Sequence, residues 1–157
     1  MHYYNQISKG YRELHKEEQL DKIKIIEENI EIKPSDIMLD LGCGPYFGDF
    51  NCKVVGIDSS IELLKQAKIP KVLGKAEYLP FKNKVFDIVV SITSIQNFDD
   101  IEKSLNEAKR VGKESFVFTF LKKSDKANKI EKLIIKHFSV EKRVEEDKDI
   151  ILITKYK

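Results

Sequence analysis

The sequence predicts an α/β fold, in which a mostly parallel sheet carries helices on both faces and ends in a C-terminal antiparallel hairpin. Short apolar runs typical of buried strands alternate along the chain with amphipathic segments of helical period. Only four charged residues join the last two apolar runs, a connection too short for parallel neighbours. Because the 157 residues are 41% hydrophobic and contain no Gly/Ser-rich linker, we expect a single domain over residues 1–157.

In the N-terminal half, the sequence predicts one long helix, one short helix and three strands. Residues 11–30 place apolar side chains at helical spacing between charged faces, and Pro34 ends this helix, so residues 1–33 are expected to form an N-terminal helical cap segment. Ser59 followed by Glu62 is a capping-box pattern, which predicts a helix to about residue 68. The strands are expected at residues 37–41, 53–57 and 71–73.

In the C-terminal half, the sequence predicts two helices and four strands. Asp99 and Glu102 resemble a second capping box and predict a helix that runs to about residue 110. Residues 124–137 form the last helical pattern, with apolar side chains on one side. The strands are expected at residues 85–92, 115–121, 138–144 and 149–156, and the first of these is a near-continuous apolar run typical of a central parallel strand.

The residues most informative about function follow the first two strands. The first strand runs through Asp40 into a turn with Gly42 and Gly44, and the second ends at Asp58. Glycines let the backbone approach a nucleotide closely, and a carboxylate can accept both hydroxyls of a ribose. The dinucleotide fingerprint requires a third glycine, where Phe47 stands, and an acid about 20 residues further on. Asp58 comes only 14 residues after Gly44, so a dinucleotide cofactor is disfavoured.

Four motifs in order resemble the class I S-adenosylmethionine-dependent methyltransferases of the LDLGCG, or methyltransferase type 11, kind. They are residues 39–44, 55–59, 76–81 and 86–91. With the terminal hairpin, the resemblance covers about residues 10–157. It implies a Rossmann-like seven-stranded sheet, S-adenosyl-L-methionine as the cofactor, and methyl transfer by direct displacement as the reaction.

The resemblance also implies how the first two motifs bind the cofactor. Asp40, Gly42 and Gly44 would form the turn around its methionine part. Asp58 would hold both ribose hydroxyls, with Ser59 beside it in the same motif. As alternatives, the glycine turn could be an ordinary strand-to-helix loop, and Asp58 could merely cap the following helix.

The remaining binding residues implied by the resemblance come from three other segments. Ala76 and Glu77 would lie beside the adenine, and Ser91 and Ile92 would contribute backbone near the cofactor ammonium. Tyr11 matches a tyrosine that closes over the cofactor in related enzymes, although an aromatic residue at a helix start can equally anchor a core.

Two departures from the family pattern concern the same site. Only nine residues separate Gly44 from Val54, so the first crossover helix is expected to be short or distorted, and the partner of the cofactor carboxylate is left open. An aspartate that accepts from the adenine amino group in relatives is replaced by Lys75, so that Glu77 or backbone would have to substitute.

The sequence identifies neither the methyl acceptor nor a catalytic residue. A sulfonium cofactor already carries the activation, so no triad is required. Lids that enclose small substrates are expected to be absent, because the fifth strand is followed only by Lys122 and Lys123 before the next helix. The open cleft predicted in this way suits RNA, another macromolecule, or a partner subunit that completes the site. The alternatives are a small-molecule methyltransferase and a non-catalytic cofactor-binding subunit.

Charge placement is the reason for preferring RNA. The formal net charge is only +2, but residues 101–157 carry 15 Lys/Arg against 10 Asp/Glu. Lys122, Lys123 and Lys126 are expected beside the active-site mouth, because ligands of open parallel sheets bind outside the carboxyl ends of the strands. A solvated helix start is the more common meaning of such lysines, and three arginines are few for phosphate recognition.

Several classes are excluded by what the sequence lacks. No apolar run reaches the roughly 18 residues of a membrane span, and the first residues have no basic-then-apolar leader pattern, so a cytoplasmic protein without membrane contact is expected. Cys43 and Cys52 lack CxxC spacing, and the three histidines have no acid or cysteine at ligand spacing. No metal site is therefore expected.

Overall fold

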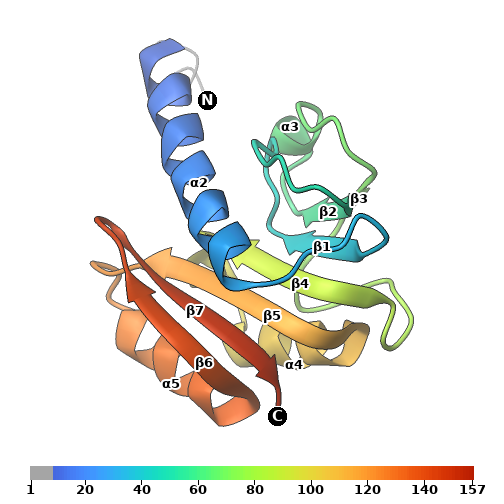
Figure 1. Cartoon of the computed structure of the whole chain (residues 1–157). Helices are drawn as coiled ribbons and strands as arrows, with labels where there is room; N and C mark the ends of the chain where they lie inside the picture. The colour runs from blue at the N-terminus through green and yellow to red at the C-terminus, as the bar shows by residue number, and fades with distance from the viewer. Residues whose placement is uncertain (1–8) are drawn as a thin grey trace.

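The computed structural model describes residues 9–157, with side chains described from residue 13 onward. One seven-stranded sheet runs through the molecule in the order β3-β2-β1-β4-β5-β7-β6 (Figure 1). All pairings from β3 to β5 are parallel, whereas β7 is antiparallel to both β5 and β6. The strands are β1 Ile37–Leu41, β2 Lys53–Asp58, β3 Lys71–Leu73, β4 Phe86–Ile92, β5 Gly112–Leu121, β6 Phe138–Glu145 and β7 Asp149–Tyr156. The predicted fold class, with its C-terminal hairpin, is confirmed.

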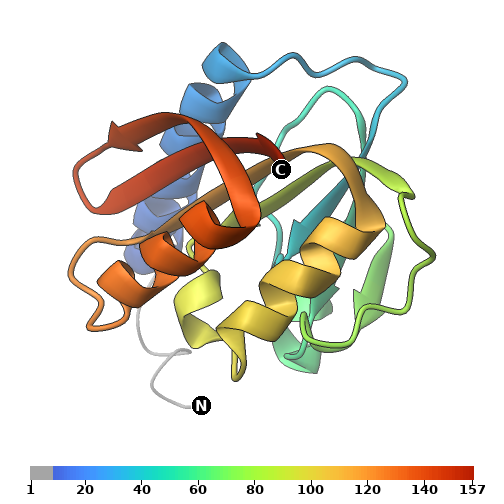
Figure 2. The same ribbon diagram turned by 90° about the horizontal axis from the view of Figure 1, so that it is seen from below.

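Helices cover both faces of this sheet. The long helix α2, Lys9–Asn29, crosses one face, while α4, Ile101–Val111, and α5, Ala127–His137, lie side by side on the other (Figures 1 and 2). The short elements are α3, Ile61–Leu64, and the 3-10 helix η1, Ile95–Asn97. Each strand alternates its side chains between the two faces, so the core has two halves.

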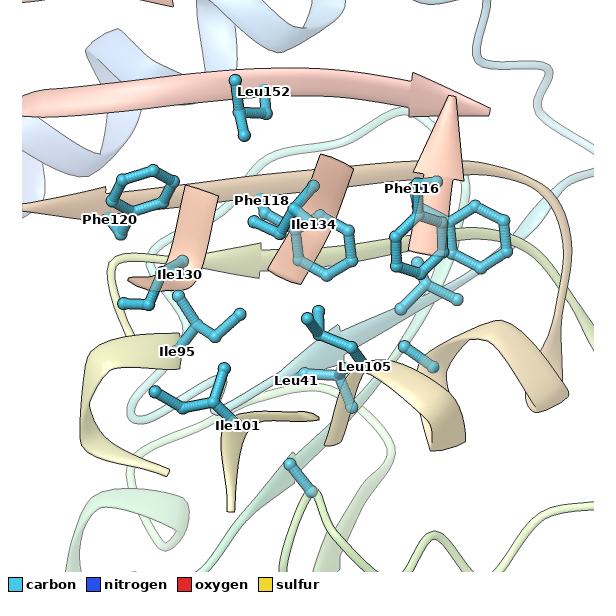
Figure 3. Close-up of a cluster of buried hydrophobic side chains, with 14 of the residues drawn as sticks. Leu41, Ile95, Ile101, Leu105, Phe116, Phe118, Phe120, Ile130, Ile134 and Leu152 are labelled. Atoms are coloured by element: carbon cyan, nitrogen blue, oxygen red, sulfur yellow. The ribbon is translucent and has the colours of Figure 1, made fainter. Parts of the chain in front are cut away.

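The half of the core under α4 and α5 is the more aromatic one. Figure 3 shows aromatic side chains of β5 over aliphatic side chains of α4, α5 and η1. All of them are at least 95% buried, and at roughly 25 cal/mol per Å² their burial is a main source of stability. The labelled members are Leu41, Ile95, Ile101, Leu105, Phe116, Phe118, Phe120, Ile130, Ile134 and Leu152.

The other half of the core holds α2 against the sheet. Ile23 and Ile26 of α2 pack in one cluster with Met38, Val90 and further side chains of β2, β5 and β7. Outside this stripe the helix surface is mostly charged or polar, although Leu14 and Leu20 are exposed, and apolar burial at one face fixes its orientation. Its N-terminal half extends past the strand ends (Figure 1).

The connections after β1 and after β2 contain less helix than the sequence predicts. Residues 42–52, all of them described, contain no helix, because 11 residues between β1 and β2 are too few for a helical crossover. Phe50, 7% exposed, fills part of the α2-side core from this loop instead. The helix expected to run to residue 68 is a single turn capped by Ser60, whose Oγ accepts from the Leu63 N–H at 3.3 Å.

The second capping box is also shifted by one residue. Asp100, not Asp99, caps α4: its carboxylate accepts from the Lys103 N–H at 3.0 Å. Asp99 pairs with Lys75 across 3.2 Å instead, and its side chain is 79% exposed. Asp99 therefore stays exposed near the carboxyl ends of the parallel strands.

Candidate functional site

A cavity of about 410 Å³ opens at the carboxyl ends of β1, β2 and β4. Parallel sheets bind ligands at this edge, where loops leave the strands in different directions. The structure brings eight of the ten residues proposed to bind the cofactor to the wall of this cavity. They are Asp40, Gly42, Gly44, Asp58, Ser59, Ala76, Glu77 and Ile92.

The glycine turn is built by backbone conformations that L residues rarely adopt. Gly42 has φ +74° and Gly44 has φ +52°. The N–H groups of Gly42 and Cys43 both donate to the Ile57 carbonyl, at 2.8 and 3.1 Å, which ties the turn to the end of β2. A Cβ on Gly42 would lie 2.6 Å from the Ser94 Oγ, whereas a Cβ on Gly44 would meet only Leu63 Cδ1, at 4.0 Å. Gly42 therefore serves the packing, and Gly44 faces open space.

Asp58 is oriented by two backbone donors. Its Oδ2 accepts from the Gly44 N–H and its Oδ1 from the Ser60 N–H, each at 2.8 Å. Each carboxylate oxygen can accept a second hydrogen bond, so both remain available to a ligand in the cavity. The carboxylate is thereby held rigidly between the glycine turn and the start of α3.

Asp40 is a buried acid without a partner among the described residues. Its side chain is 5% exposed, and its Oδ1 has no hydrogen-bond donor in the part of the chain that the structure describes. Burial, and then the nearby charge of Asp58, raise the pKa of Asp40 to about 7. An unpaired carboxyl on a cavity wall is a position where a cationic group of a ligand would be stabilised.

The raised pKa of Asp40 predicts a pH dependence of stability. Between about pH 4 and 7 the folded state binds more protons than the unfolded state, whose aspartate has a pKa near 3.8. The contribution of the protonated Asp40 carboxyl to the free energy of unfolding is fully present below about pH 4. It is lost as pH rises through about 7. We therefore expect the wild type to lose about 1.4 kcal/mol per pH unit relative to Asp40→Asn within this window. Urea unfolding of both proteins at several pH values measures the difference, and parallel pH profiles would contradict it.

Glu77 is buried and already engaged. Its side chain is 5% exposed, and its Oε2 accepts from the Asp100 N–H at 2.9 Å. This contact fixes the loop after β3 to the start of α4. Lys75 lies on the cavity wall as well, but its ammonium is taken up by Asp99.

Two of the ten residues are not on the cavity wall as described. Ser91 is fully buried, and its hydroxyl contacts the Leu41 carbonyl at 3.2 Å and the Ser94 Oγ at 2.8 Å. Ser91 thus braces the strand end behind the glycine turn, and its neighbour Ile92 lines the cavity instead. The side chain of Tyr11 lies outside the described residues.

One wall of the cavity, contributed by α2, was not predicted from the sequence. His15, Gln19 and Ile23 line the cavity and are spaced by four residues, so they share one face of the helix. The His15 ring meets Phe47 edge to face, with centroids 5.8 Å apart. Burial, and then the charge of Lys22, lower the pKa of His15. The spacing was visible in the sequence, but nothing in it indicated that this face would lie over the strand ends.

The described residues contain neither a candidate metal site nor a candidate membrane-spanning helix. Within residues 9–157, no group of three or more His, Cys, Asp or Glu side chains could hold a metal ion. None of the helices in that same range has the length and apolar character needed to cross a bilayer.

The sequence pattern of the Methyltransferase domain family matches residues 39–120, more than half of the chain. The chain belongs to this family. The family implies S-adenosylmethionine as the cofactor, which confirms the resemblance seen in the four motifs. The match spans the glycine turn, Asp58, Glu77 and the end of β4, so it includes the cavity wall outside α2.

The chain is similar to a curated protein in sequence and to several solved structures in fold. The uncharacterized protein MJ1252 of Methanocaldococcus jannaschii is 38% identical over 129 residues, which are 75% of this chain and 49% of that protein. The chain thus spans about half the length, or less, of the curated relatives it matches. The PH0226 protein of Pyrococcus horikoshii has a TM-score of 0.79 at 19% identity, and the two chains cover each other by 100% and 99%.

Two further solved structures share this architecture. A SAM-dependent methyltransferase of Aquifex aeolicus has a TM-score of 0.75 at 17% identity, with 89% of this chain and 92% of that chain covered. The methyltransferase in a complex with the Trm112 methyltransferase activator of Haloferax volcanii has a TM-score of 0.76 at 14% identity, with 94% of each chain covered. At these identities the likeness concerns the fold.

The cavity fits the cofactor that the family implies. S-Adenosylmethionine carries an ammonium, a ribose with two hydroxyls and a planar adenine. The unpartnered Oδ1 of Asp40 suits the ammonium, and the carboxylate of Asp58 has acceptor capacity for the hydroxyls. Gly44 leaves open space that a side chain would fill. The donor and acceptor set of this chain is therefore compatible with the group.

Proposed function

We propose that this domain binds S-adenosylmethionine in the cavity at the carboxyl ends of β1, β2 and β4 and catalyses methyl transfer from it. The observation that carries the proposal is the pairing of Asp58 with the open Gly44 turn on one cavity wall, within a chain of the methyltransferase family. Residues 1–157 would form one domain, with residues 1–33 as the cap whose helix α2 lines the same cavity.

The proposed binding roles follow from charge and hydrogen-bonding capacity. Asp58 would accept the ribose hydroxyls, Asp40 would stabilise the ammonium in its ionised form, and Gly44 would allow close backbone approach. Ala76 and Glu77 would border the adenine, with Ser59 and Ile92 completing the wall. Tyr11 and Ser91 are kept as proposed contributors, Tyr11 by its side chain and Ser91 by its backbone.

In this reaction the protein mainly has to align the methyl acceptor with the methyl group and the sulfur of the cofactor. The cofactor supplies a methyl group on a sulfonium, with a neutral thioether as leaving group. The residues of this chain hold and orient, and correct alignment of reacting groups can contribute on the order of 7–11 kcal/mol. The proposal therefore needs no acid, base or nucleophile from the chain.

For the acceptor we propose RNA or another macromolecule. The lysines come after the carboxyl end of β5, which is parallel to β4 and ends at the same edge of the sheet as the cavity. The Lys126 ammonium donates to the carbonyl of Gln96, two residues after the cavity-lining Ser94. Lys123 is exposed, and Lys122 lies 4.0 Å from Glu145. A partner subunit that completes the site is the second possibility, favoured by a structural neighbour that was solved with an activator. A cytoplasmic location is proposed with it.

Calorimetry tests the cofactor first. Titration with S-adenosylmethionine and S-adenosylhomocysteine is expected to give saturable binding, and NAD is expected to give none. Transfer of a tritiated methyl group to total RNA, to protein or to small metabolites then separates the acceptor classes. Cofactor binding without transfer to any of the three would indicate a non-catalytic cofactor-binding subunit.

RNA binding is expected to depend on the three lysines after β5. Replacing Lys122, Lys123 and Lys126 with glutamate is expected to weaken RNA binding steeply and to reduce the slope of log K against log salt by about two to three units. Cofactor affinity is expected to stay the same, because none of the three lines the cavity. Filter binding at several salt concentrations measures the slope. A flat salt response in the wild type, or unchanged RNA binding in the variant, would favour the small-molecule or partner-completed alternatives.

A further inference from the structure

A cluster of four polar side chains, three of them buried, adjoins the cofactor cavity through its fourth member, Thr93. Lys22 comes from α2, Thr93 from the residue after β4, Thr119 from β5 and Asp149 from the start of β7. Lys22 is 3% exposed, and Thr119 and Asp149 are fully buried. The ammonium of Lys22 lies 3.3 Å from Asp149 Oδ1, so the cluster contains a buried ion pair.

Thr93 is the member on which the other three converge. Its Oγ1 accepts from the Lys22 ammonium at 2.8 Å and donates to Asp149 Oδ2 at 2.6 Å. Its N–H donates to the Thr119 Oγ1 at 2.8 Å and to the Thr119 carbonyl at 3.1 Å. The Thr119 hydroxyl in turn donates to Asp149 Oδ2 at 3.2 Å.

The backbone of Thr93 has a conformation that its side chain disfavours. Its φ is +53°, and among the described residues only Tyr46 and Lys84 share a positive φ without being glycine. Thr93 is the β-branched residue of the three, and β-branched residues are genuine outliers in this region. Such strain persists only where the surroundings over-determine it, and here Lys22, Thr119 and Asp149 supply those surroundings.

The position of Thr93 connects this strain to the cofactor cavity. Ile92, Thr93 and Ser94 all line the cavity, so the conformation of Thr93 sets where this wall lies. Ser94 reaches the Leu41 carbonyl at 2.8 Å and stands against Gly42, so the same wall supports the glycine turn. A second cavity of about 340 Å³ has Lys22 and Asp149 in its wall and shares Thr93 with the first.

We propose that Lys22 and Asp149 are positioning residues for cofactor binding: their ion pair holds Thr93 in its left-handed conformation and thereby holds the Ile92–Ser94 wall of the cavity. The pair also ties α2, whose His15 and Gln19 line both cavities, to the strand ends. This inference rests on the proposed function, because the ligand whose binding it affects is S-adenosylmethionine.

The test removes the pair as a unit and then relieves the strain. Removing one partner alone leaves an uncompensated buried charge and lowers stability for that reason. The double variant Lys22→Met/Asp149→Val avoids this, and we expect it to fold and to bind S-adenosylmethionine at least tenfold more weakly by calorimetry. Glycine adopts a positive φ without strain, so adding Thr93→Gly is expected to restore the affinity to within about threefold of the wild type.

A purely structural role would give a different pattern. It would lower the melting temperature of the double variant while the folded protein bound the cofactor normally, and Thr93→Gly would rescue nothing. Thr154→Val is the matched control, because it removes another buried polar side chain of β7. The Thr154 hydroxyl donates to the Phe116 carbonyl at 2.7 Å, and neither residue lines the cavity. Affinity of the double variant within twofold of the wild type, or no rescue by Thr93→Gly, would overturn the inference.

Hydrogen exchange separates this inference from the proposed function. In cofactor-free protein we expect the Thr93 amide to exchange at least tenfold faster in Lys22→Met/Asp149→Val than in the wild type, and no change at Thr93 in Thr154→Val. Unchanged exchange at Thr93 overturns the inference whatever the cofactor does. A wild type that binds no S-adenosylmethionine overturns the proposed function and, with it, the role of the pair in cofactor binding.

Discussion

Replacing Asp58 with alanine is expected to weaken S-adenosylmethionine binding by about one to two orders of magnitude. Hydrogen bonds to an ionised acceptor contribute about 1.5–3 kcal/mol, and each 1.4 kcal/mol is a tenfold change in affinity. The alanine variant would lose the hydrogen bonds from the ribose hydroxyls and also those from the Gly44 and Ser60 N–H groups. Both losses act on the same wall of the cavity. Calorimetric titration of wild type and variant measures the effect.

A second carboxylate on the same cavity provides the matched control. Asp99 lines the cavity but is 79% exposed and paired with Lys75, so Asp99→Ala is expected to change cofactor affinity less than threefold. Circular dichroism and thermal melting verify that both variants fold. Full affinity in Asp58→Ala, or submicromolar affinity of the wild type for NAD, would remove the methyltransferase proposal.

Local sequence signals predicted the strands well. The runs at 37–41, 71–73 and 149–156 match β1, β3 and β7 residue for residue. These strands combine apolar side chains with clear breaks at both ends, and the sheet buries them as the pattern requires. The terminal hairpin was predictable for the same reason, since a charged turn of four residues leaves only an antiparallel partner.

Helix starts were less predictable, because neighbouring residues compete for the same role. Ser60 rather than Ser59 caps α3, and Asp100 rather than Asp99 caps α4. Both residues of each pair are good caps, so the choice depends on where the chain leaves the preceding strand. At the first of these places Asp58 takes the Ser60 N–H, which fixes the chain one residue later than the pattern suggested.

The site was predictable only where its residues sit on short motifs. The glycine turn follows β1, Asp58 ends β2 and Glu77 comes shortly after β3, so sequence order alone brings them to one edge of the sheet. The face of α2 with His15 and Gln19 reaches the cavity through tertiary packing, which depends on Ile23 and Ile26 meeting the sheet. The buried Lys22–Asp149 pair joins residues 127 positions apart, and no local pattern signals such a pair.

Replacing Gly44 with valine is expected to abolish detectable S-adenosylmethionine binding while leaving a folded protein. The valine Cβ would have no contact closer than the 4.0 Å to Leu63 Cδ1, so the fold can accommodate it. Its two methyl groups would, however, occupy the space in which the cofactor approaches the backbone. The left-handed backbone at φ +52° adds strain of roughly 1–3 kcal/mol, which a melting curve would show as a loss of several degrees.

The contrast with Gly42 makes this expectation specific to the ligand. A Cβ at Gly42 would lie 2.6 Å from the Ser94 Oγ and 2.7 Å from its Cβ, so Gly42→Ala is expected to lose stability and cofactor binding together. Gly44→Val is expected to lose binding completely but only as much stability as its backbone strain accounts for, because its side chain meets the cavity and not the protein. Thermal melting and calorimetry on both variants separate the two cases. Normal cofactor affinity in Gly44→Val would mean that the turn does not contact the cofactor, and the site would then have to lie elsewhere along the strand ends.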